Sequence, residues 1–256
     1  GPCARDAARD LRGLLTRIRL GRPMVTLKIA ASADGKIAGP GGATVAITGP
    51  EALDASHMMR ATHDAILIGI GTALADDPRL TCRLPGMADR SPVRVLLDSR
   101  LRLPPTSRVL DDAPAIPTLV FARPDAPHGN AEALRDRGAE VMAVPAGEGG
   151  HVDLATVLRD LGDRGIGRVL VEGGAAIYKS VLAAGLDDEI VVFRAPCEIG
   201  PQGISALPGS GLALFDDQDA YRRLQASPRG RDLMLHYERA APFQEWSSCL
   251  PGSSAT

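Results

Sequence analysis

The sequence predicts an α/β fold built on a mixed, mainly parallel sheet. Short apolar runs alternate with stretches of helical periodicity along most of the chain, a pattern typical of parallel strands joined by helices on both faces. Near the carboxyl end, two strand-like stretches at 220–228 and 231–240 lie only a few residues apart around "RGR". This spacing favours an antiparallel hairpin at the edge of the sheet.

The amino-terminal half predicts two helices and three strands. Residues 4–17 have helical periodicity, and the apolar run 24–32 is expected to be a strand that ends in the turn "ADGK". The stretch "ITGPEALDASHMMRA" begins a helix, with Thr48 as N-cap, Pro50 near its start and Glu51 three residues after the cap. Further strands are expected at 65–70 and 93–97.

The rest of the chain continues the alternation as one domain. Strands are expected at 118–121, 140–144, 168–171 and 189–194, and helices at 131–137, 154–161 and 175–184. Strands continue in the same style across the Pro/Gly-rich loops at 104–117, 146–150 and 200–211. We therefore expect a helix and linker in residues 1–20, one domain in residues 21–240 and a tail in residues 241–256.

Composition excludes several classes of partner. The 256 residues are 45% hydrophobic, with mean hydropathy near zero, which is enough to bury a substantial core. Lys and Arg total 29 against 31 Asp and Glu, so there is no basic excess of the kind that holds nucleic acid or an anionic membrane. No uncharged apolar stretch approaches the ~20 residues of a spanning helix, and no signal-peptide core opens the chain.

The four cysteines indicate neither a metal site nor a disulfide framework. They are far apart and form no C-x-x-C or Cys/His cluster with metal-ligand spacing. This usage suits a reducing cytoplasm, which is the expected location. The cysteines are Cys3, Cys82, Cys197 and Cys249.

Two strand ends carry residues suited to a ligand site. "LIGIGTALADDPRLTCR" passes Gly69 and Gly71 and then sets two Asp and two Arg within eight positions. "RVLVEGGAAIYKS" runs from a strand through Glu172 and two glycines into a helix, whose N–H groups and dipole favour a pyrophosphate. Ligands bind at the carboxyl ends of strands in such sheets. The alternatives are a solvated polar loop after the first strand and glycines used only for tight packing after the second.

The order of five segments resembles a known family. "TLKIAASADGKIA", "ITGPEA", "HMMRATHDAILIGIGTALADDPRLTCR", "VRVLLDS" and "VLVEGG" are similar to the reductase domain of riboflavin biosynthesis, typified by the carboxyl-terminal half of the bifunctional pyrimidine deaminase/reductase. The similarity covers roughly residues 20–240. It implies a three-layer α/β/α fold like that of dihydrofolate reductase, which binds NADPH without the usual dinucleotide fingerprint.

The resemblance also implies site residues. Arg60 and Arg83 fall where two guanidiniums converge on a substrate phosphate, a geometry that their forked donors favour. The implied substrate contacts are Thr44, Arg60, Leu80, Arg83 and Glu172. The implied cofactor contacts are Ala30, Ala46, Thr72, Asp76, Ser99, Gly174, Ala175, Ala176, Ile177, Tyr178, Lys179 and Ser180.

The chain departs from the family pattern in places. Ala46 stands where an aromatic residue is frequent, so a wall over the cofactor is absent, and Thr44 and Val45 stand where Ser and a polar residue are frequent. The zinc-deaminase signature H-x-E followed by P-C-x-x-C is missing, so no deamination is expected. "RGLLTRIRLGRP" resembles the junction of the fused proteins, and both an excised and a free-standing domain stay open.

The implied activity is NADPH-dependent reduction of the ribosyl group of 5-amino-6-(5-phosphoribosylamino)uracil to ribityl. Glu172, Asp76 and Lys28 are the candidates for proton handling, although Lys28 equally suits an ion pair with Asp34 or another carboxylate. Ser99 and Arg100, after a strand end, suit the 2′-phosphate of NADPH. Two alternatives remain: a reductase of the same fold acting on a pterin, dihydrofolate or another pyrimidine, and a nucleotide-binding module without turnover.

A homodimer is expected for two reasons. The family pairs as homodimers, and the strand at 189–194 leaves Val191, Val192 and Phe193 in an apolar run near the expected sheet edge. An exposed apolar edge strand needs covering.

Overall fold

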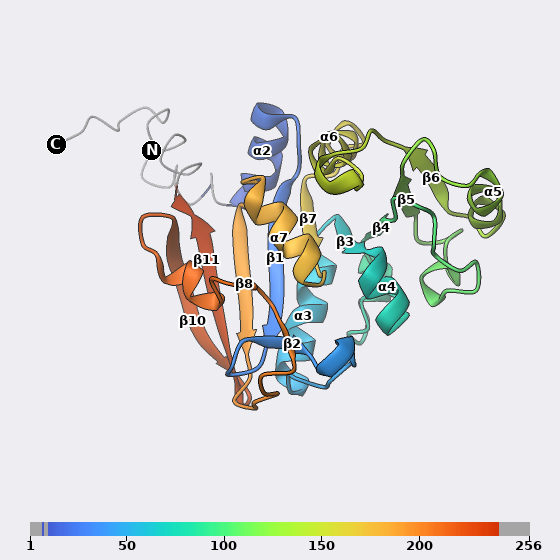
Figure 1. Ribbon diagram of the computed structural model, residues 1–256. Helices are drawn as coiled ribbons and strands as arrows, with labels where there is room; N and C mark the ends of the chain where they lie inside the picture. Colours follow the sequence, from blue (N-terminus) through green and yellow to red (C-terminus); the bar gives the residue numbers. More distant parts are fainter. Residues whose placement is uncertain (1–6, 8–9, 241–256) are drawn as a thin grey trace.

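A nine-stranded mixed sheet forms the centre of the computed structural model, which describes residue 7 and residues 10–240 (Figure 1). The strand order is β10-β11-β8-β1-β7-β3-β4-β5-β6. Strand β11 is antiparallel to both β10 and β8, whereas all other neighbours in this sheet are parallel. The predicted fold class, a mainly parallel sheet with a carboxyl-terminal antiparallel hairpin, is confirmed.

The strands lie close to their predicted positions. Those of the large sheet are β1 (Met24–Ala31), β3 (Ala65–Gly69), β4 (Val93–Leu97), β5 (Thr118–Ala122), β6 (Glu140–Ala143), β7 (Arg168–Val171), β8 (Glu189–Arg194), β10 (Tyr221–Arg229) and β11 (Asp232–Arg239). A second, two-stranded sheet joins β2 (Lys36–Ala38) to β9 (Ile204–Ser205). This small sheet was not predicted, because two or three residues are too few to show a period.

Six α-helices connect the strands of the described chain. They are α2 (Arg12–Leu20), α3 (Pro50–Thr62), α4 (Ile70–Asp76), α5 (His128–Asp136), α6 (Leu154–Asp163) and α7 (Ala175–Ala183). The first predicted helix, 4–17, overlaps α2, but residues 1–6 and 8–9 lie outside the described residues, as does the predicted tail 241–256. Across the parts that the structure describes, no helix has the length and apolar character needed to cross a membrane.

Helix α3 begins one residue later than predicted. Gly49 is the N-cap, and no side chain caps the helix, so the assignment of Thr48 as N-cap is wrong. The Gly49 N–H instead donates to Asp232 Oδ2 on β11 at 2.7 Å, a partner 183 positions away that local sequence does not reveal. Pro50 and Glu51 do occupy the first turn, as predicted.

The segment after β3 begins as a helix, and the polar loop that was considered follows that helix, at residues 77–83. Residues 70–76 form α4, which ends where Asp77 takes a left-handed conformation with φ of 40°. The Asp77 N–H donates to the Ala73 carbonyl at 3.0 Å. Helix α4 therefore presents its first turn, and not extended chain, at the carboxyl end of β3.

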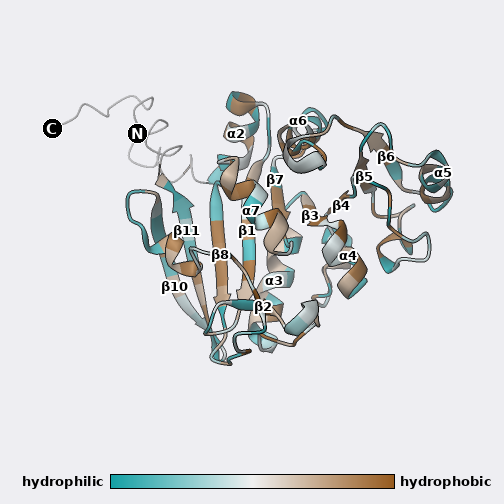
Figure 2. Ribbon diagram, in the orientation of Figure 1, coloured by the Kyte–Doolittle hydropathy of each residue, from teal (hydrophilic) through white to brown (hydrophobic). Residues whose placement is uncertain are grey.

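Helices cover both faces of the sheet, so the domain has three layers. Side chains of α6 and α7, such as Leu158 and Val181, pack with Leu27 and Ile29 of β1 in one core. On the other face of the sheet, helices α3, α4 and α5 pack against side chains of β3, β4, β5, β7 and β8. In Figure 2 brown dominates β7 and much of β8, whereas the outer hairpin and α5 carry more teal.

Strand β8 is not at the edge of the sheet. It lies between β1 and β11, and Val191, Val192 and Phe193 are buried. The carboxyl-terminal hairpin covers this apolar run, because β11 pairs with β8 and β10 forms the edge (Figure 1). The edge argument for a homodimer is therefore wrong, and the dimer stays a prediction that rests on the family resemblance.

Candidate active site

A cavity of about 1080 Å³ opens at the carboxyl ends of β1, β3, β4 and β7. Helices α3, α4 and α7 and the segments around 42–48 and 149–152 complete its walls. The structure brings most of the predicted site residues together here: Lys28, Ala30, Thr44, Ala46, Arg60, Thr72, Asp76, Leu80, Ser99, Glu172, Gly174, Ala175, Ala176, Ile177, Tyr178 and Ser180. Pockets for drug-sized ligands reach about 1,000 Å³ at the upper end, so this cavity is large for a ligand site.

Two predicted residues do not line the cavity. Lys179 is exposed on α7, and Arg83 is exposed in the chain that follows Leu80. The Arg83 side chain nevertheless lies within electrostatic range of the site. Burial lowers the pKa of the Arg83 guanidinium, and the nearby charges of Arg60 and Arg108 lower it further.

A buried ion cluster forms the floor of the cavity. The Glu172 carboxylate accepts two hydrogen bonds from Arg60, from Nε at 2.9 Å and from Nη2 at 2.8 Å. Lys28 Nζ lies 3.8 Å from Glu172 Oε2, so the partner of Lys28 is Glu172 and not Asp34. The three side chains are only 11–13% exposed. They come from β1, from α3 and from the end of β7, which the parallel pairing of β1 with β7 brings together.

The cluster fixes the protonation of its acid. Burial raises the pKa of Glu172, but the positive charges of Lys28 and Arg60 outweigh it and bring the pKa down to about 2. Burial lowers the pKa of Lys28 below its usual value, and the negative charge of Glu172 offsets only part of this shift. At neutral pH Glu172 is therefore an anion, and Lys28 is the member of the pair that carries an ionisable proton, held less tightly than by an ordinary lysine.

Thr44 and Asp76 meet across the cavity wall. Thr44 Oγ1 donates to Asp76 Oδ1 at 2.6 Å, which joins the segment after β2 to the last turn of α4. Both residues are exposed and both line the cavity. The predicted substrate contact and the predicted cofactor contact are thus directly hydrogen-bonded to each other.

The glycine turns after β3 and β7 hold α7 close to the sheet. A Cβ on Gly69 would lie 2.9 Å from Ile177 Cγ1, and one on Gly173 would lie 2.9 Å from Ile177 Cβ. These glycines serve packing, the alternative that the sequence left open. Gly71, by contrast, faces open space, and Gly174 is the N-cap of α7 with no side-chain cap.

Tyr178 connects α7 to the ion cluster. Its hydroxyl donates to the Lys28 carbonyl at 2.7 Å, and its ring is buried. Burial and the charge of Glu172 raise the pKa of the phenol, which stays protonated. Tyr178 therefore holds β1 and α7 together beneath the cavity floor.

The carboxyl end of β4 forms a cationic rim. The Ser99 hydroxyl accepts a hydrogen bond from the Val152 N–H at 3.0 Å and so attaches the 149–152 segment to this end. Arg100, Arg102 and His151 line the same part of the cavity. Arg102 and His151 were not predicted. Arg102 lies two residues after Arg100, whereas nothing local marks His151.

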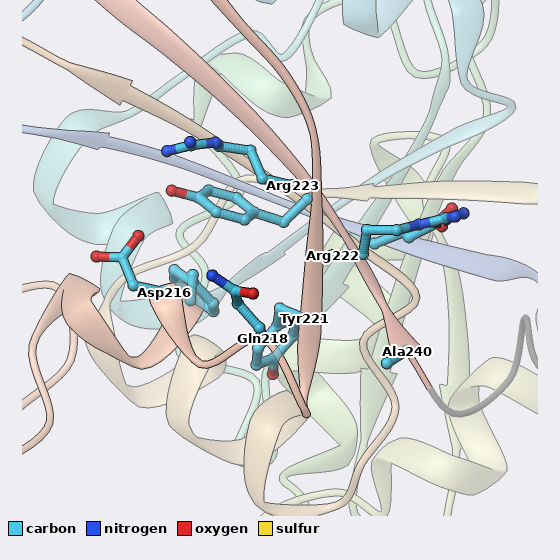
Figure 3. Close-up of a pocket in the computed structure, with 9 residues that line it drawn as sticks. Asp216, Gln218, Tyr221, Arg222, Arg223 and Ala240 are labelled. Atoms are coloured by element: carbon cyan, nitrogen blue, oxygen red, sulfur yellow. Dashed lines mark hydrogen bonds and ion pairs between the residues drawn. The ribbon is translucent and has the colours of Figure 1, made fainter.

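A second cavity, of about 580 Å³, lies beside the carboxyl-terminal hairpin and contains none of the predicted site residues. Figure 3 shows Arg222 and Arg223 extending from β10 to opposite sides, with Asp216 and Gln218 across from the strand. The Tyr221 hydroxyl donates to Asp187 Oδ2 at 2.8 Å, and the Tyr221 ring meets Phe215 edge-on. These contacts pack the hairpin onto the domain.

The described residues contain no evident metal site. Among residue 7 and residues 10–240, no group of three or more His, Cys, Asp or Glu side chains is placed to hold a metal ion. Within the same ranges Cys82 and Cys197 are free thiols.

Comparison with known proteins identifies relatives. The model of the RibD C-terminal domain matches residues 23–224. Riboflavin biosynthesis protein RibD of Bacillus amyloliquefaciens is 37% identical over 233 residues, which are 90% of this chain and 62% of that protein. The 2,5-diamino-6-ribosylamino-4(3H)-pyrimidinone 5′-phosphate reductase of Methanothermobacter thermautotrophicus is 38% identical over 218 residues, 84% of this chain and 98% of that protein.

Solved structures share the fold over the same span. RibD of Acinetobacter baumannii superposes with a TM-score of 0.76 at 28% identity, covering 91% of this chain and 62% of that one. The diaminohydroxyphosphoribosylaminopyrimidine deaminase/5-amino-6-(5-phosphoribosylamino)uracil reductase of Thermotoga maritima gives 0.74 at 27% identity, covering 92% and 62%. The chain thus spans about three fifths of the length of these larger relatives.

Proposed function

Because the chain belongs to the RibD C-terminal domain family, we propose that it is an NADPH-dependent reductase that converts the ribosyl group of 5-amino-6-(5-phosphoribosylamino)uracil to ribityl. The observation that carries this proposal is the buried Lys28–Glu172–Arg60 cluster on the floor of a large cavity at the carboxyl ends of the strands. Charged side chains buried together in a cavity are typical of sites whose reaction develops charge.

The names of the relatives support a pyrimidine ribotide substrate. Those of the Thermotoga and Methanothermobacter proteins both specify reduction of a phosphorylated ribosylaminopyrimidine. The two substrates differ in the ring: an aminouracil in one and a diaminopyrimidinone in the other. We assign the aminouracil to this chain, and the experiment below includes both.

The residues present fit a pyridine dinucleotide. Helix α7, of nine residues, begins at Gly174 without a side-chain cap or an acidic residue in its first turn, so its N–H groups and dipole suit a pyrophosphate. The open space at Gly71 leaves room for the ligand to approach the backbone. Ser99, Arg100 and Arg102 would then hold the 2′-phosphate of NADPH, since guanidiniums bind phosphate with charge-assisted hydrogen bonds.

The ion cluster divides the chemistry between its members. Lys28 Nζ donates a proton to the ring oxygen as the sugar opens, which leaves a cationic iminium between C1′ and the exocyclic nitrogen. The Glu172 carboxylate, a permanent anion, stabilises that positive charge. The reduced nicotinamide, when bound, supplies the hydride for C1′. The proton and the hydride together account for the two hydrogens that the product gains.

The phosphate end of the substrate belongs beside Arg83. Within the described chain the Arg83 guanidinium makes no hydrogen bond or ion pair, so it is available to an anion. Arg60 donates through Nη1 to the Thr81 carbonyl at 3.1 Å and through its other nitrogens to Glu172. Arg60 therefore contributes charge to the phosphate site, and Arg83 contributes the direct contact.

Oxidation of NADPH with a panel of substrates tests the proposed function. We expect turnover with the phosphoribosylaminouracil, slower turnover with the diaminopyrimidinone ribotide and none with dihydrofolate. Preferred turnover of dihydrofolate would replace the substrate assignment with the pterin alternative. NADPH binding without oxidation in the presence of any pyrimidine would mean that the protein is a nucleotide-binding module without turnover.

The working form is a homodimer in the cytoplasm. The family resemblance supports the dimer, and the absence of a cysteine framework in the sequence supports the location. Sedimentation at micromolar concentration measures the assembly. A mass equal to one 26.8 kDa chain would contradict the dimer.

A further inference from the structure

Helix α3 holds the backbone of the chain around Arg83 through three hydrogen bonds. The Arg83 N–H donates to His57 Nδ1 at 3.3 Å, and Cys82 Sγ donates to the His57 carbonyl at 3.5 Å. Arg60, one turn further along the helix, donates to the Thr81 carbonyl at 3.1 Å. Residues 81–83 have no regular secondary structure of their own, so these bonds fix their position.

The hydrogen bond from Arg83 sets the protonation of His57. A backbone N–H can only donate, so Nδ1 of His57 must be the unprotonated ring nitrogen, and the proton of the neutral ring lies on Nε2. A doubly protonated imidazolium has no acceptor to offer and breaks this bond. The contact between α3 and Arg83 therefore exists only while His57 is neutral.

The surroundings of His57 favour the neutral ring. His57 is buried, with 8% of its surface exposed. The charged groups facing it are Asp54 and Arg60 from α3, Arg83 from the bonded segment and Glu172 from the end of β7. Burial lowers the pKa of His57, the two arginines lower it further, and the two carboxylates oppose them in part.

We propose that His57 is a positioning residue that holds Arg83 at the phosphate end of the substrate site through its unprotonated Nδ1. This role rests on the proposed function, because it takes the free Arg83 guanidinium as the group that binds the substrate phosphate. His57 does not line the cavity and acts only through Arg83. Its loss should weaken substrate binding and leave the chemistry at Glu172 and Lys28 intact.

Two substitutions of His57 separate positioning from a general role in stability. His57→Ala removes the acceptor, whereas His57→Asn keeps one, because the Asn Oδ1 is bonded to Cγ just as the histidine Nδ1 is. We expect His57→Ala to raise the substrate KM roughly tenfold, the value of one hydrogen bond, with kcat and the NADPH Kd within about twofold of wild type. His57→Asn should restore the wild-type KM.

Amide hydrogen exchange gives a readout that needs no turnover. The Arg83 amide should exchange faster in His57→Ala and stay protected in His57→Asn, since exchange follows local opening. In the wild type this protection should fall below pH 6.5, once corrected for intrinsic rates, as His57 becomes protonated. In His57→Asn the protection should not change in that range.

His63→Ala is the matched control. His63 is a second buried histidine at the end of α3, but its ring contacts the Met59 carbonyl at 2.7 Å and Thr26 Oγ1 at 3.0 Å, away from residues 81–83. The His63→Ala substitution should lower thermal stability and leave the exchange of the Arg83 amide unchanged.

Normal exchange and substrate KM in His57→Ala, or a His57→Asn variant that behaves like His57→Ala, would overturn the proposal. Absence of turnover in the wild type would instead refute the proposed function, while exchange would still decide whether His57 fixes Arg83.

Discussion

Glu172 and Arg60 form a two-point ion pair on the cavity floor, with Arg60 Nε and Nη2 donating at 2.9 and 2.8 Å to the two carboxylate oxygens. Lys28 lies on the same carboxylate at 3.8 Å. The cluster therefore contains one buried anion and two buried cations. Its net positive charge attracts an anionic substrate. The predictions for Glu172 and Lys28 depend on this imbalance.

Glu172→Gln should lower kcat about 10²- to 10⁴-fold, the range expected for a group that acts in the transition state. The substitution keeps the shape of the side chain and removes the charge that stabilises the iminium. The NADPH Kd should change little, because the proposed cofactor contacts lie on α7 and at the end of β4. Steady-state kinetics and a binding titration measure the two effects.

The control for that change is Glu140→Gln. Glu140 also accepts two hydrogen bonds from one arginine, Arg164, at 2.9 and 2.7 Å, but it is exposed on β6 and far from the cavity in the sheet order. It should leave kcat unchanged. A folded Glu172→Gln protein with wild-type kcat would remove Glu172 from the mechanism.

The value of kcat should fall at alkaline pH as Lys28 loses its proton. Burial lowers the pKa of Lys28, so the proton donor is lost at a pH below the usual lysine range. The charge of Glu172 raises this pKa, so the residual activity of Glu172→Gln should decline at a still lower pH. Lys28→Met should have very low activity with no alkaline limb. An alkaline limb that stays in place in Glu172→Gln would show that another group donates the proton.

Gly69→Ala and Gly173→Ala should both destabilise the fold by displacing Ile177, but only the first should be relieved by Ile177→Ala. A Cβ added at position 69 would meet Cγ1 and Cδ1 of Ile177, which that substitution removes. A Cβ added at position 173 would meet Ile177 Cβ at 2.9 Å, and this atom remains when Ile177 is replaced by alanine.

Thermal melts of the single and double variants form a double-mutant cycle that measures this difference. The coupling between positions 69 and 177 should reach about 1–3 kcal/mol, the usual cost of overpacking a core. Equal relief of both glycine substitutions would mean that α7 shifts as a whole.

Arg100→Ala should reduce the preference for NADPH over NADH. A hydrogen bond to a charged group contributes about 1.5–3 kcal/mol, so kcat/KM for NADPH should fall roughly 10- to 100-fold while that for NADH stays near wild type. Arg90→Ala, which changes an exposed arginine of the short helix at Ala88–Arg90, is the control. Equal losses with both cofactors would place Arg100 away from the 2′-phosphate.

The sequence predicted the sheet well because strands such as β3 and β5 are almost continuous apolar runs of the kind buried on both faces. It also indicated which strand ends meet at the cavity, since parallel strands direct their carboxyl ends to one edge. The sequence did not reveal which residues far apart in the chain form hydrogen bonds and ion pairs with each other. Glu172 and Arg60 are 112 positions apart, and no local pattern shows that Arg60 donates its hydrogen bonds to Glu172 and Thr81.

Other differences also arise from long-range contacts. The N-cap of α3 depends on Asp232 of β11, and the burial of Val191 depends on that same strand pairing with β8. Helix α4 was missed because its seven residues follow a strand directly and include an open glycine, Gly71. Glycine lowers helix propensity by about 1 kcal/mol relative to alanine.

Transfer of deuterium from NADPH labelled at C4 of the nicotinamide tests the central claim most directly. Product formed from 5-amino-6-(5-phosphoribosylamino)uracil in ordinary water should carry one deuterium, at C1′ of the ribityl chain, when the label is on the transferred face. Mass spectrometry and NMR of the product locate it. Two results would contradict the account. One is a reduced product with only solvent hydrogen at C1′, whichever face of the nicotinamide carries the label. The other is label at another position of the product.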